Sequence, residues 1–347
     1  MEELKKWMSK NKVKYVVLMN GEKPNPNVIY FSGYTGYGCL IIPDKDEPFL
    51  YVPDMEIERA KKLGKFKVIQ AKKKLFEFLG KGKIGLDFEN TSFKEEEFLR
   101  KTYKRKFADV SDIIKKARMV KNSDEILKVR QACKISDEIF RKLFLGWNFK
   151  TEEEVAAFLI KETRLRGCEL AFEPIVASGK NASVPHHSAS GKLQKGFCVI
   201  DFGVKFKGYC SDTTRTIYLG NPNEKEKNFY KNFLELQMEL LSKVKEGVKC
   251  KKLHEYSEEL LGEKLIHALG HGVGIDLHED PRISIRGEDC LTEGMVIAIE
   301  PGHYVENEMG IRIEDTLLVK KEGYEILTGF TKKLIAISGP GKAPKTF

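Results

Sequence analysis

The chain has 347 residues, of which 41% are hydrophobic and 32% are charged, and its formal net charge is +9. This length favours two domains, and the composition is that of a soluble globular protein and excludes a disordered or fibrous one. No apolar run reaches the ~20 residues needed to span a bilayer, and residues 1–7 mix acids and bases unlike a secretion signal. We therefore expect a cytoplasmic protein with no membrane partner.

The positive charge is spread along the chain, because lysines and glutamates are interleaved in nearly every segment. Proteins that bind nucleic acid usually gather their basic residues into one block or face, so we expect no nucleic-acid partner. The seven cysteines lie far apart and include no C-x-x-C pair. This spacing disfavours a disulfide framework and a structural zinc site, and it is typical of reduced thiols.

Residues 1–118 alternate short apolar strands with stretches whose apolar residues recur at helical spacing. Helices are expected at about 55–63 and 93–102, each with a charged outer face. Strands are expected at 15–19, 38–42, 49–52 and 84–88. The pattern predicts a small α/β domain, and neither helix groups polar residues that suggest chemistry.

A domain boundary is expected at about 118–122. A long amphipathic helix then begins, with Ser123 as its predicted N-cap, and reaches about Leu145. The capping box at 151–154 predicts a second helix that ends before Gly167, and a third helix is expected from Asn223 to about Lys245. Strands are expected at 197–203, 206–218, 295–300 and 311–319. This order predicts an α+β domain with a curved antiparallel sheet.

Three carboxylates occur inside or directly after apolar strands of this second domain. They are Asp201, Glu300 and Glu314. A carboxylate that leaves water without a partner loses several kcal/mol of hydration, so each of them needs a counter-charge. One such residue is as consistent with a buried salt bridge as with a functional site. Three on separate strands favour a shared cation.

Asp212 and His271 complete a predicted set of five metal ligands with Asp201, Glu300 and Glu314. Four carboxylates and one imidazole are suitable for two adjacent divalent cations, because hard and borderline ions favour oxygen ligands with limited nitrogen. A pair of metals about 3.5 to 4 Å apart can hold a bridging hydroxide and stabilise a developing oxyanion. The predicted reaction is therefore hydrolysis.

A zinc-binding helix is the alternative interpretation of the segment around His271. His267 and His271 are spaced i and i+4, as in H-E-x-x-H, but the glutamate of that motif is missing. The segment is also rich in glycine, which opposes a helix. We therefore disfavour this reading and expect structural roles for His254, His267 and His303.

Seven short segments, taken in order and spacing, resemble the pita-bread metallopeptidases. This family includes Xaa-Pro dipeptidases (prolidases), aminopeptidase P, methionine aminopeptidases and creatinase. Residues 1–118 resemble the creatinase-type amino-terminal domain of prolidases, and residues 119–347 then correspond to the catalytic domain. The segments are Pro185-His186-His187, Asp201, Ser211 to Thr216, Gly270 to Gly274, His278 to Arg282, Ile299 to Gly302 and Gly310 to Thr316.

The resemblance implies a role for each predicted ligand. Asp201 would bind one metal, His271 and Glu300 the other, and Asp212 and Glu314 would bridge the two. Glu300 would also move the proton of the bridging water as a general acid and base.

Further residues gain a role by the same resemblance. His186 and His278 would stabilise the tetrahedral intermediate, with His186 also binding substrate, and Arg282 would bind the free carboxylate of a dipeptide. Arg312 and Thr214 would orient the ligands. Because His187 directly follows His186, the sequence leaves open which of them enters the site, and we prefer His186.

The resemblance thus implies hydrolysis of the Xaa-Pro bond of dipeptides, with a small peptide as substrate. Aminopeptidase P activity on longer peptides is an alternative, and an inactive pita-bread binding protein is another. Methionine aminopeptidase is disfavoured because those enzymes usually lack the amino-terminal domain, and creatinase because creatinases do not keep the five ligands. Two divalent ions per subunit are expected, manganese or cobalt first, with zinc or iron also compatible, in a homodimer.

Overall fold

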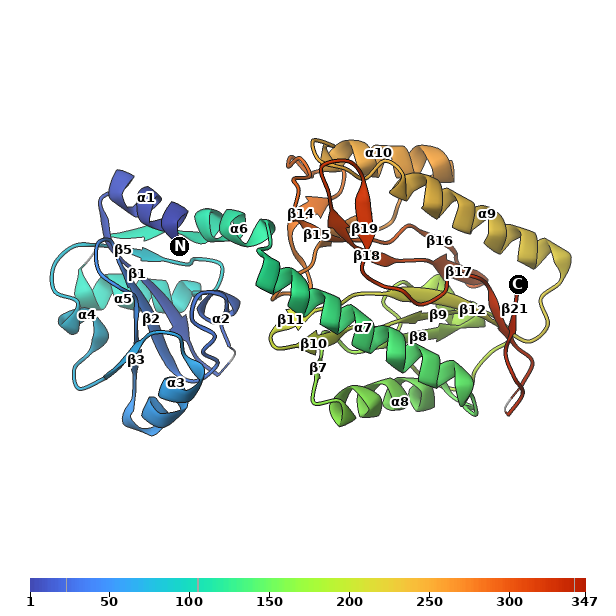
Figure 1. The fold of residues 1–347 in the computed structure, drawn as a ribbon, viewed down its shortest axis with the longest axis horizontal. Helices are drawn as coiled ribbons and strands as arrows, with labels where there is room; N and C mark the ends of the chain where they lie inside the picture. Colours follow the sequence, from blue (N-terminus) through green and yellow to red (C-terminus); the bar gives the residue numbers. More distant parts are fainter. Residues whose placement is uncertain (23, 105, 340) are drawn as a thin grey trace. The chain divides into compact units, whose positions relative to one another are not determined.

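The structure is a computed structural model, and it describes residues 1–22, 24–104, 106–339 and 341–347. The chain forms two compact units, Met1–Arg118 and Met119–Phe347. Figure 1 shows the first unit in blue to cyan and the second in green to red. Each unit has its own hydrophobic core and is described by itself.

The first unit is built on a mixed six-stranded sheet with the order β4-β3-β2-β1-β5-β6. β1 pairs antiparallel with β2 and parallel with β5. Besides a 3-10 turn at Asp54–Glu56, its elements are α1 (Glu2–Lys10), β1 (Val13–Asn20), α2 (Pro26–Ser32), β2 (Gly38–Pro43), β3 (Phe49–Val52), α3 (Ile57–Leu63), β4 (Lys67–Gln70), α4 (Leu75–Phe78), β5 (Lys83–Leu86), α5 (Phe93–Tyr103), β6 (Phe107–Asp109) and α6 (Ser111–Met119).

Helices cover both faces of this sheet, because successive side chains of a strand point to opposite faces. Val16 and Leu18 of β1 pack with Leu4 of α1 and residues of α2, α3 and α6. Val17, between them in sequence, packs with Leu99 of α5 on the other face. The predicted α/β class of this domain is confirmed.

The second unit combines helices with mostly antiparallel sheets, which confirms the predicted α+β class. It also has a 3-10 turn at Gly179–Ser183. Its helices and strands are α7 (Ser123–Leu145), α8 (Glu152–Leu165), β7 (Glu169–Leu170), β8 (Ile175–Ser178), β9 (Gly196–Asp201), β10 (Val204–Phe206), β11 (Tyr209–Cys210), β12 (Thr214–Leu219), α9 (Glu224–Leu241), α10 (Cys250–Leu261), β13 (Gly270–Gly272), β14 (Glu279–Ile283), β15 (Val296–Ile299), β16 (Gly302–Val305), β17 (Met309–Arg312), β18 (Asp315–Val319), β19 (Tyr324–Ile326), β20 (Ile335–Ile337) and β21 (Lys345–Thr346).

Two five-stranded sheets form the centre of this unit, with the orders β21-β20-β12-β9-β8 and β14-β13-β15-β18-β19. In Figure 1 the strands lie between one helix pair, α7 and α8, and another, α9 and α10. Phe140 of α7 and Leu159 of α8 share a core with Ile200 of β9. Leu240 of α9 and Leu253 of α10 pack with Ile297 of β15. Each of the two sheets is therefore packed against its own helix pair.

Local details differ from the sequence expectations. The N-cap of α7 is Asn122, not Ser123, because the Asn122 side chain accepts the Glu125 N–H and Glu125 binds back to the Asn122 N–H. The third predicted helix ends at Leu241 instead of about Lys245, and α10 was not predicted. The expected strand 206–218 is divided among β10, β11 and β12, and 311–319 between β17 and β18. The break between β11 and β12 contains Asp212, and the break between β17 and β18 contains Glu314.

Among the described residues, no helix is long and apolar enough to cross a membrane.

Candidate metal centre

Four of the five predicted ligands come from strand ends or from the breaks between strands, and the fifth, His271, lies within β13. Asp201 is the last residue of β9, and it stands opposite Thr214 at the start of β12. Glu300 directly follows β15, and His271 in β13 stands opposite Ala298 of that strand.

The ligand atoms of these residues gather in one place. The offered atoms of Asp201, Asp212 and Glu314 all lie within 4.8 Å of one another, and so do those of His271, Glu300 and Glu314. Because Glu314 belongs to both groups, the two groups adjoin. A third group consists of Asp212, His271 and His278. The sequence analysis predicts no ligand role for His278.

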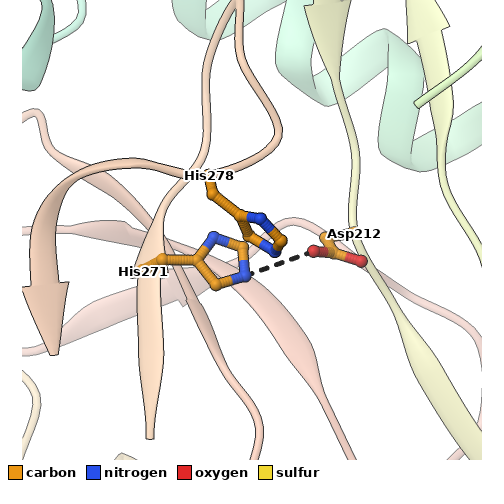
Figure 2. A group of neighbouring side chains, drawn as sticks. All are labelled: Asp212, His271 and His278. Atoms are coloured by element: carbon orange, nitrogen blue, oxygen red, sulfur yellow. Dashed lines mark ion pairs between the residues drawn. The ribbon is translucent and has the colours of Figure 1, made fainter. Parts of the chain in front are cut away.

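His271 presents its Nε2 atom to the carboxylates. This atom lies 3.4 Å from Oδ2 of Asp212 and 3.7 Å from Oε1 of Glu300. Its Nδ1 lies 3.1 Å from the Gly272 carbonyl oxygen, which can only accept, so Nδ1 carries the proton and Nε2 is left with a lone pair. Figure 2 shows this ring facing Asp212 and close to the ring of His278, at a centroid distance of 4.2 Å.

The carboxylates repel one another in the absence of a cation. Burial, together with the charges of Asp201 and Glu300, raises the pKa of Asp212 well above its ordinary value. Burial raises the pKa of Glu300 to about 8, against the opposing effect of Arg312. Burial and the nearby carboxylates, Asp212 first, also raise the pKa of Glu314. Burial lowers the pKa of His271 to about 3, so this imidazole is neutral and available as a ligand at physiological pH.

The residues present fit a pair of divalent cations. Oδ1 of Asp201 and Oδ1 of Asp212 are buried and have no hydrogen-bond partner within the described part of the chain. A buried carboxylate oxygen that no donor satisfies is costly unless a cation is its partner. The surrounding donor set of carboxylates and one neutral imidazole is also the chemistry that manganese, cobalt, zinc and iron accept.

Arg312 and Thr214 hold two of the carboxylates in place. Arg312 donates from Nη2 to Oδ2 of Asp201 at 2.7 Å and from Nε to the Thr214 hydroxyl at 3.2 Å. The Thr214 hydroxyl donates to Oε2 of Glu314 at 2.8 Å. Burial disfavours the Arg312 cation, but Tyr304, Asp201 and Glu300 outweigh that effect and raise the pKa of Arg312.

Two family models match the chain. Residues 1–120 match the creatinase/prolidase N-terminal domain, and residues 128–321 match metallopeptidase family M24. The chain belongs to metallopeptidase family M24. The matched range includes all five carboxylate and imidazole residues described above.

Similar proteins cover nearly the whole length of this M24 chain. It is 38% identical to a protein of Pyrococcus furiosus named Xaa-Pro dipeptidase, over 96% of this chain and 99% of that one. The crystal structure of the prolidase from Pyrococcus horikoshii superposes with a TM-score of 0.88 at 36% identity, over 96% and 99% of the two chains. The X-Pro aminopeptidase from Thermotoga maritima gives 0.85 at 33% identity, over 94% and 98%.

The remaining predicted residues of this M24 chain are His186, His278 and Arg282. His186 is exposed, and its charge lowers the pKa of both His278 and His267, although burial is the larger cause in each case. Arg282 lies on β14 opposite His271 in the register, with its side chain exposed. His187 does not join the ligands; its Nε2 donates to Oε2 of Glu152 at 2.7 Å.

Three residues, Tyr304, His267 and Glu152, were assigned no site role from the sequence. The Tyr304 hydroxyl accepts from Nη1 of Arg312 at 2.9 Å and lies 3.1 Å from Nε2 of His267. Burial lowers the pKa of His267 to about 4, and its Nδ1 donates to the Ala268 carbonyl, so Nε2 accepts a hydrogen bond from the Tyr304 hydroxyl. Glu152 is the third. The spacing of Tyr304, four residues after Glu300, is the one sequence signal that places it near a ligand.

Proposed function

We propose that this chain is a two-metal peptidase that hydrolyses the Xaa-Pro bond of dipeptides. The observation that carries the proposal is the convergence of four carboxylates and one neutral imidazole, with two buried carboxylate oxygens that have no hydrogen-bond partner among the described residues. The substrate class is supported by the relative named Xaa-Pro dipeptidase and by the prolidase structure that superposes on the chain.

We assign the ligands as follows. Asp201 would hold one cation, His271 and Glu300 would hold the other, and Asp212 and Glu314 would be shared by both. The overlap of the two ligand groups at Glu314 supports its bridging role. When bound, such a pair supplies Lewis-acid polarisation of a carbonyl and lowers the pKa of water, which are the two requirements of amide hydrolysis at neutral pH.

The protein's own side chains supply proton transfer and orientation. Glu300 is assigned as the general acid and base, because its carboxylate belongs to the ligand set and a positioned carboxylate can exchange a proton with a neighbouring water. His186 and His278 are assigned as hydrogen-bond donors to the charge that develops on the substrate oxygen. Arg282 is assigned to the free carboxylate of the dipeptide, with a bidentate geometry that lysine could not reproduce.

Aminopeptidase P activity is the second candidate function. The superposition of the Thermotoga maritima X-Pro aminopeptidase favours it, with a TM-score only slightly lower than that of the prolidase. The exposed Arg282 guanidinium favours a dipeptide instead, because a longer peptide has no free carboxylate at that position.

We extend the proposal to the setting of the enzyme. Manganese or cobalt is the proposed metal, with zinc or iron compatible with the same donors. The proposed domain boundary follows residue 118, with a creatinase-type domain of residues 1–118 and a catalytic domain of residues 119–347. A cytoplasmic homodimer is proposed, and sedimentation of the protein as a monomer at working concentration would contradict the dimer.

Hydrolysis assays with metal-stripped protein test the proposed function. Met-Pro, Met-Ala and an Xaa-Pro-Xaa tripeptide are incubated with and without added manganese or cobalt. Metal-dependent cleavage of Met-Pro, with Met-Ala left intact, is the expected result. Cleavage of the tripeptide alone would favour aminopeptidase P. Failure to cleave any of the three would overturn both and favour an inactive member of the family that binds a partner.

A further inference from the structure

We propose that Glu152, through its pair with His187, is a positioning residue that holds the segment 178–190 so that His186 faces the metal centre. The inference rests on the proposed peptidase function, and it adds a residue that touches neither a metal ligand nor the substrate. Glu152 is the first residue of α8, and its side chain is completely buried.

The Glu152 carboxylate accepts hydrogen bonds from four residues of this segment. Oε1 accepts from the Ser178 N–H and the Ser178 hydroxyl, both at 2.7 Å, and from Nδ2 of Asn181 at 3.0 Å. Oε2 accepts from Nε2 of His187 at 2.7 Å and from the Ser190 N–H at 3.0 Å. One carboxylate thus holds the start, the middle and the end of the segment.

The cost of burying this carboxylate explains why the arrangement is specific. A buried carboxylate is tolerated only when its oxygens are satisfied by donors. His187 is one of these donors, and the His187 side chain is only 15% exposed. If the segment moved, five donors and the anion would lose their partners together, so the segment has one strongly preferred position.

The adjacent histidines therefore have different tasks. His187 is covered and bound to Glu152, away from the metal ligands. His186 is exposed, and the Pro185 carbonyl immediately before it accepts from Nη1 of Arg312, which binds Asp201. The anchoring of His187 answers the question that the sequence leaves open, because the ring held by Glu152 is not available to a substrate.

The segment is also fixed on the side that faces the metal centre. The Pro185 carbonyl, immediately before His186, accepts from Nη1 of Arg312 at 3.3 Å. Gly310 of β17 packs so closely on the Ala182 carbonyl that no side chain would fit there. His186 is thus placed between a contact to Arg312, which binds Asp201, and the anchor at Glu152. Loss of either contact should shift its ring.

The test compares Glu152→Gln with Glu153→Gln in the full-length, metal-loaded protein. Glu153 is the matched control: it is the next residue of α8 and binds the Gly191 N–H at 2.9 Å, but it is exposed and makes no contact with His187. The amide of Glu152→Gln keeps the shape and removes the charge. We expect kcat on Met-Pro to fall by about 10- to 100-fold, since an error of about 1 Å in a reacting group costs that much.

Two further readouts separate positioning from general damage. The metal content of Glu152→Gln should equal that of the wild type, because the segment contains no proposed metal ligand, and kcat should fall more than KM changes. His187→Leu should repeat the loss of kcat, and it serves as the second variant if Glu152→Gln does not fold. His187→Gln, whose amide can still donate to Glu152, should restore most of the activity that His187→Leu loses.

Each outcome has one meaning. Activity of Glu152→Gln equal to that of Glu153→Gln, in a wild type that cleaves Met-Pro, overturns the positioning role alone. Loss of metal together with activity in Glu152→Gln overturns it too, since the carboxylate would then support the centre as a whole. His187→Gln as inactive as His187→Leu would mean that His187 itself acts on the substrate. A wild type that cleaves no peptide overturns the proposed function and this inference with it.

Discussion

Nη2 of Arg312 lies 2.7 Å from Oδ2 of Asp201, so a guanidinium that is 3% exposed neutralises one of the four carboxylates of the metal centre. The other oxygen of Asp201, Oδ1, has no hydrogen-bond partner in the described part of the chain. The arginine therefore fixes one oxygen and leaves the other directed to a cation. The orientation of Asp201, a proposed metal ligand, therefore depends on Arg312, which is not a proposed ligand.

Arg312→Lys tests this dependence. Lysine keeps the charge, but it has no planar fork with which to bind Asp201, Thr214 and Tyr304 at once. We expect the Kd for manganese to rise by about 10- to 100-fold, the usual effect of removing a group that orients a ligand, with a similar loss of kcat/KM. Metal titration by calorimetry measures the Kd for manganese. Arg130→Lys is the control, because Arg130 pairs with Glu325 at the surface. Wild-type metal affinity in Arg312→Lys would contradict the argument.

Asp212→Asn should have opposite effects on activity and on the stability of the metal-free protein. The change removes a proposed bridging ligand, so we expect metal and activity to be lost. It also removes the Asp212 carboxyl group, whose pKa is raised by burial, by Asp201 and by Glu300. The metal-free variant should therefore have a higher free energy of unfolding than the metal-free wild type.

Urea unfolding in a chelator measures this second effect, and Asp124→Asn, at an exposed aspartate, is its control. An Asp212→Asn protein that keeps its metal and activity would refute the ligand assignment. A variant that loses metal but gains no stability would refute the repulsion among the carboxylates.

The stabilisation by metal should grow with pH. In the metal-free protein the pKa of Glu300 is raised to about 8 from an ordinary 4.5. Between these values the folded state holds a proton that the unfolded state has released, so the free energy of unfolding falls as pH rises through this window. Asp212 and Glu314 act in the same direction. The neutral His271 adds no competing proton, since its pKa is lowered to about 3.

A cation that binds these carboxylates displaces their protons, so its apparent affinity should rise by about tenfold per pH unit for each proton displaced. Tm measured at pH 6, 7 and 8, in a chelator and in saturating manganese, checks this. The difference between the two Tm values should widen toward pH 8. A difference that is independent of pH would mean that the carboxylates are already ionised before the metal binds.

Local signals in the sequence were enough for α3, α5, α7, α8 and α9 and for several strands, whereas short elements such as α4 and β7 were not predicted. The strand at Phe49–Val52 was predicted to the residue, because its apolar run ends at Pro53. The helix after Thr151 was predicted by its capping box, which the structure contains. α10 was not predicted, since its N-cap is Lys249, with no side-chain hydrogen bond, and its first turn has no acidic residue. Its formation depends on burial against other elements, which local patterns do not contain.

The residues of the site also divide into those that local sequence patterns reveal and those that depend on contacts between distant segments. A carboxylate within an apolar strand is anomalous in sequence, so Asp201 and Glu300 could be identified one by one. Glu152 gave no such signal, because a glutamate in the first turn of a helix is ordinary and two more follow it. Its burial depends on the segment 178–190 folding over it, a contact between residues far apart in the chain. The same contact distinguishes His186 from His187, which are equivalent in sequence.

Arg215 stabilises the strand that follows Glu314, and its loss should be costly. It is 2% exposed; its Nη2 donates to Oδ1 of Asp315 and to the Phe330 carbonyl, both at 2.8 Å, and its Nη1 donates to the Glu314 carbonyl. Burial alone would raise the pKa of Asp315, but Arg215 and Lys332 lower it below its ordinary value. The Asp315 contribution to stability is therefore present above about pH 4 and is lost as pH falls further.

Arg215→Met leaves a completely buried carboxylate with Lys332 as its remaining cation and removes a donor from four carbonyl groups. We expect the free energy of unfolding to fall by about 3–5 kcal/mol, the usual effect of breaking a buried ion pair from one side. Urea unfolding in a chelator measures this without a contribution from bound metal. Arg130→Met, whose pair with Glu325 is nearly 40% exposed on both sides, should cost less than about 1 kcal/mol. Equal losses in the two variants would mean that Lys332 alone is sufficient to balance Asp315.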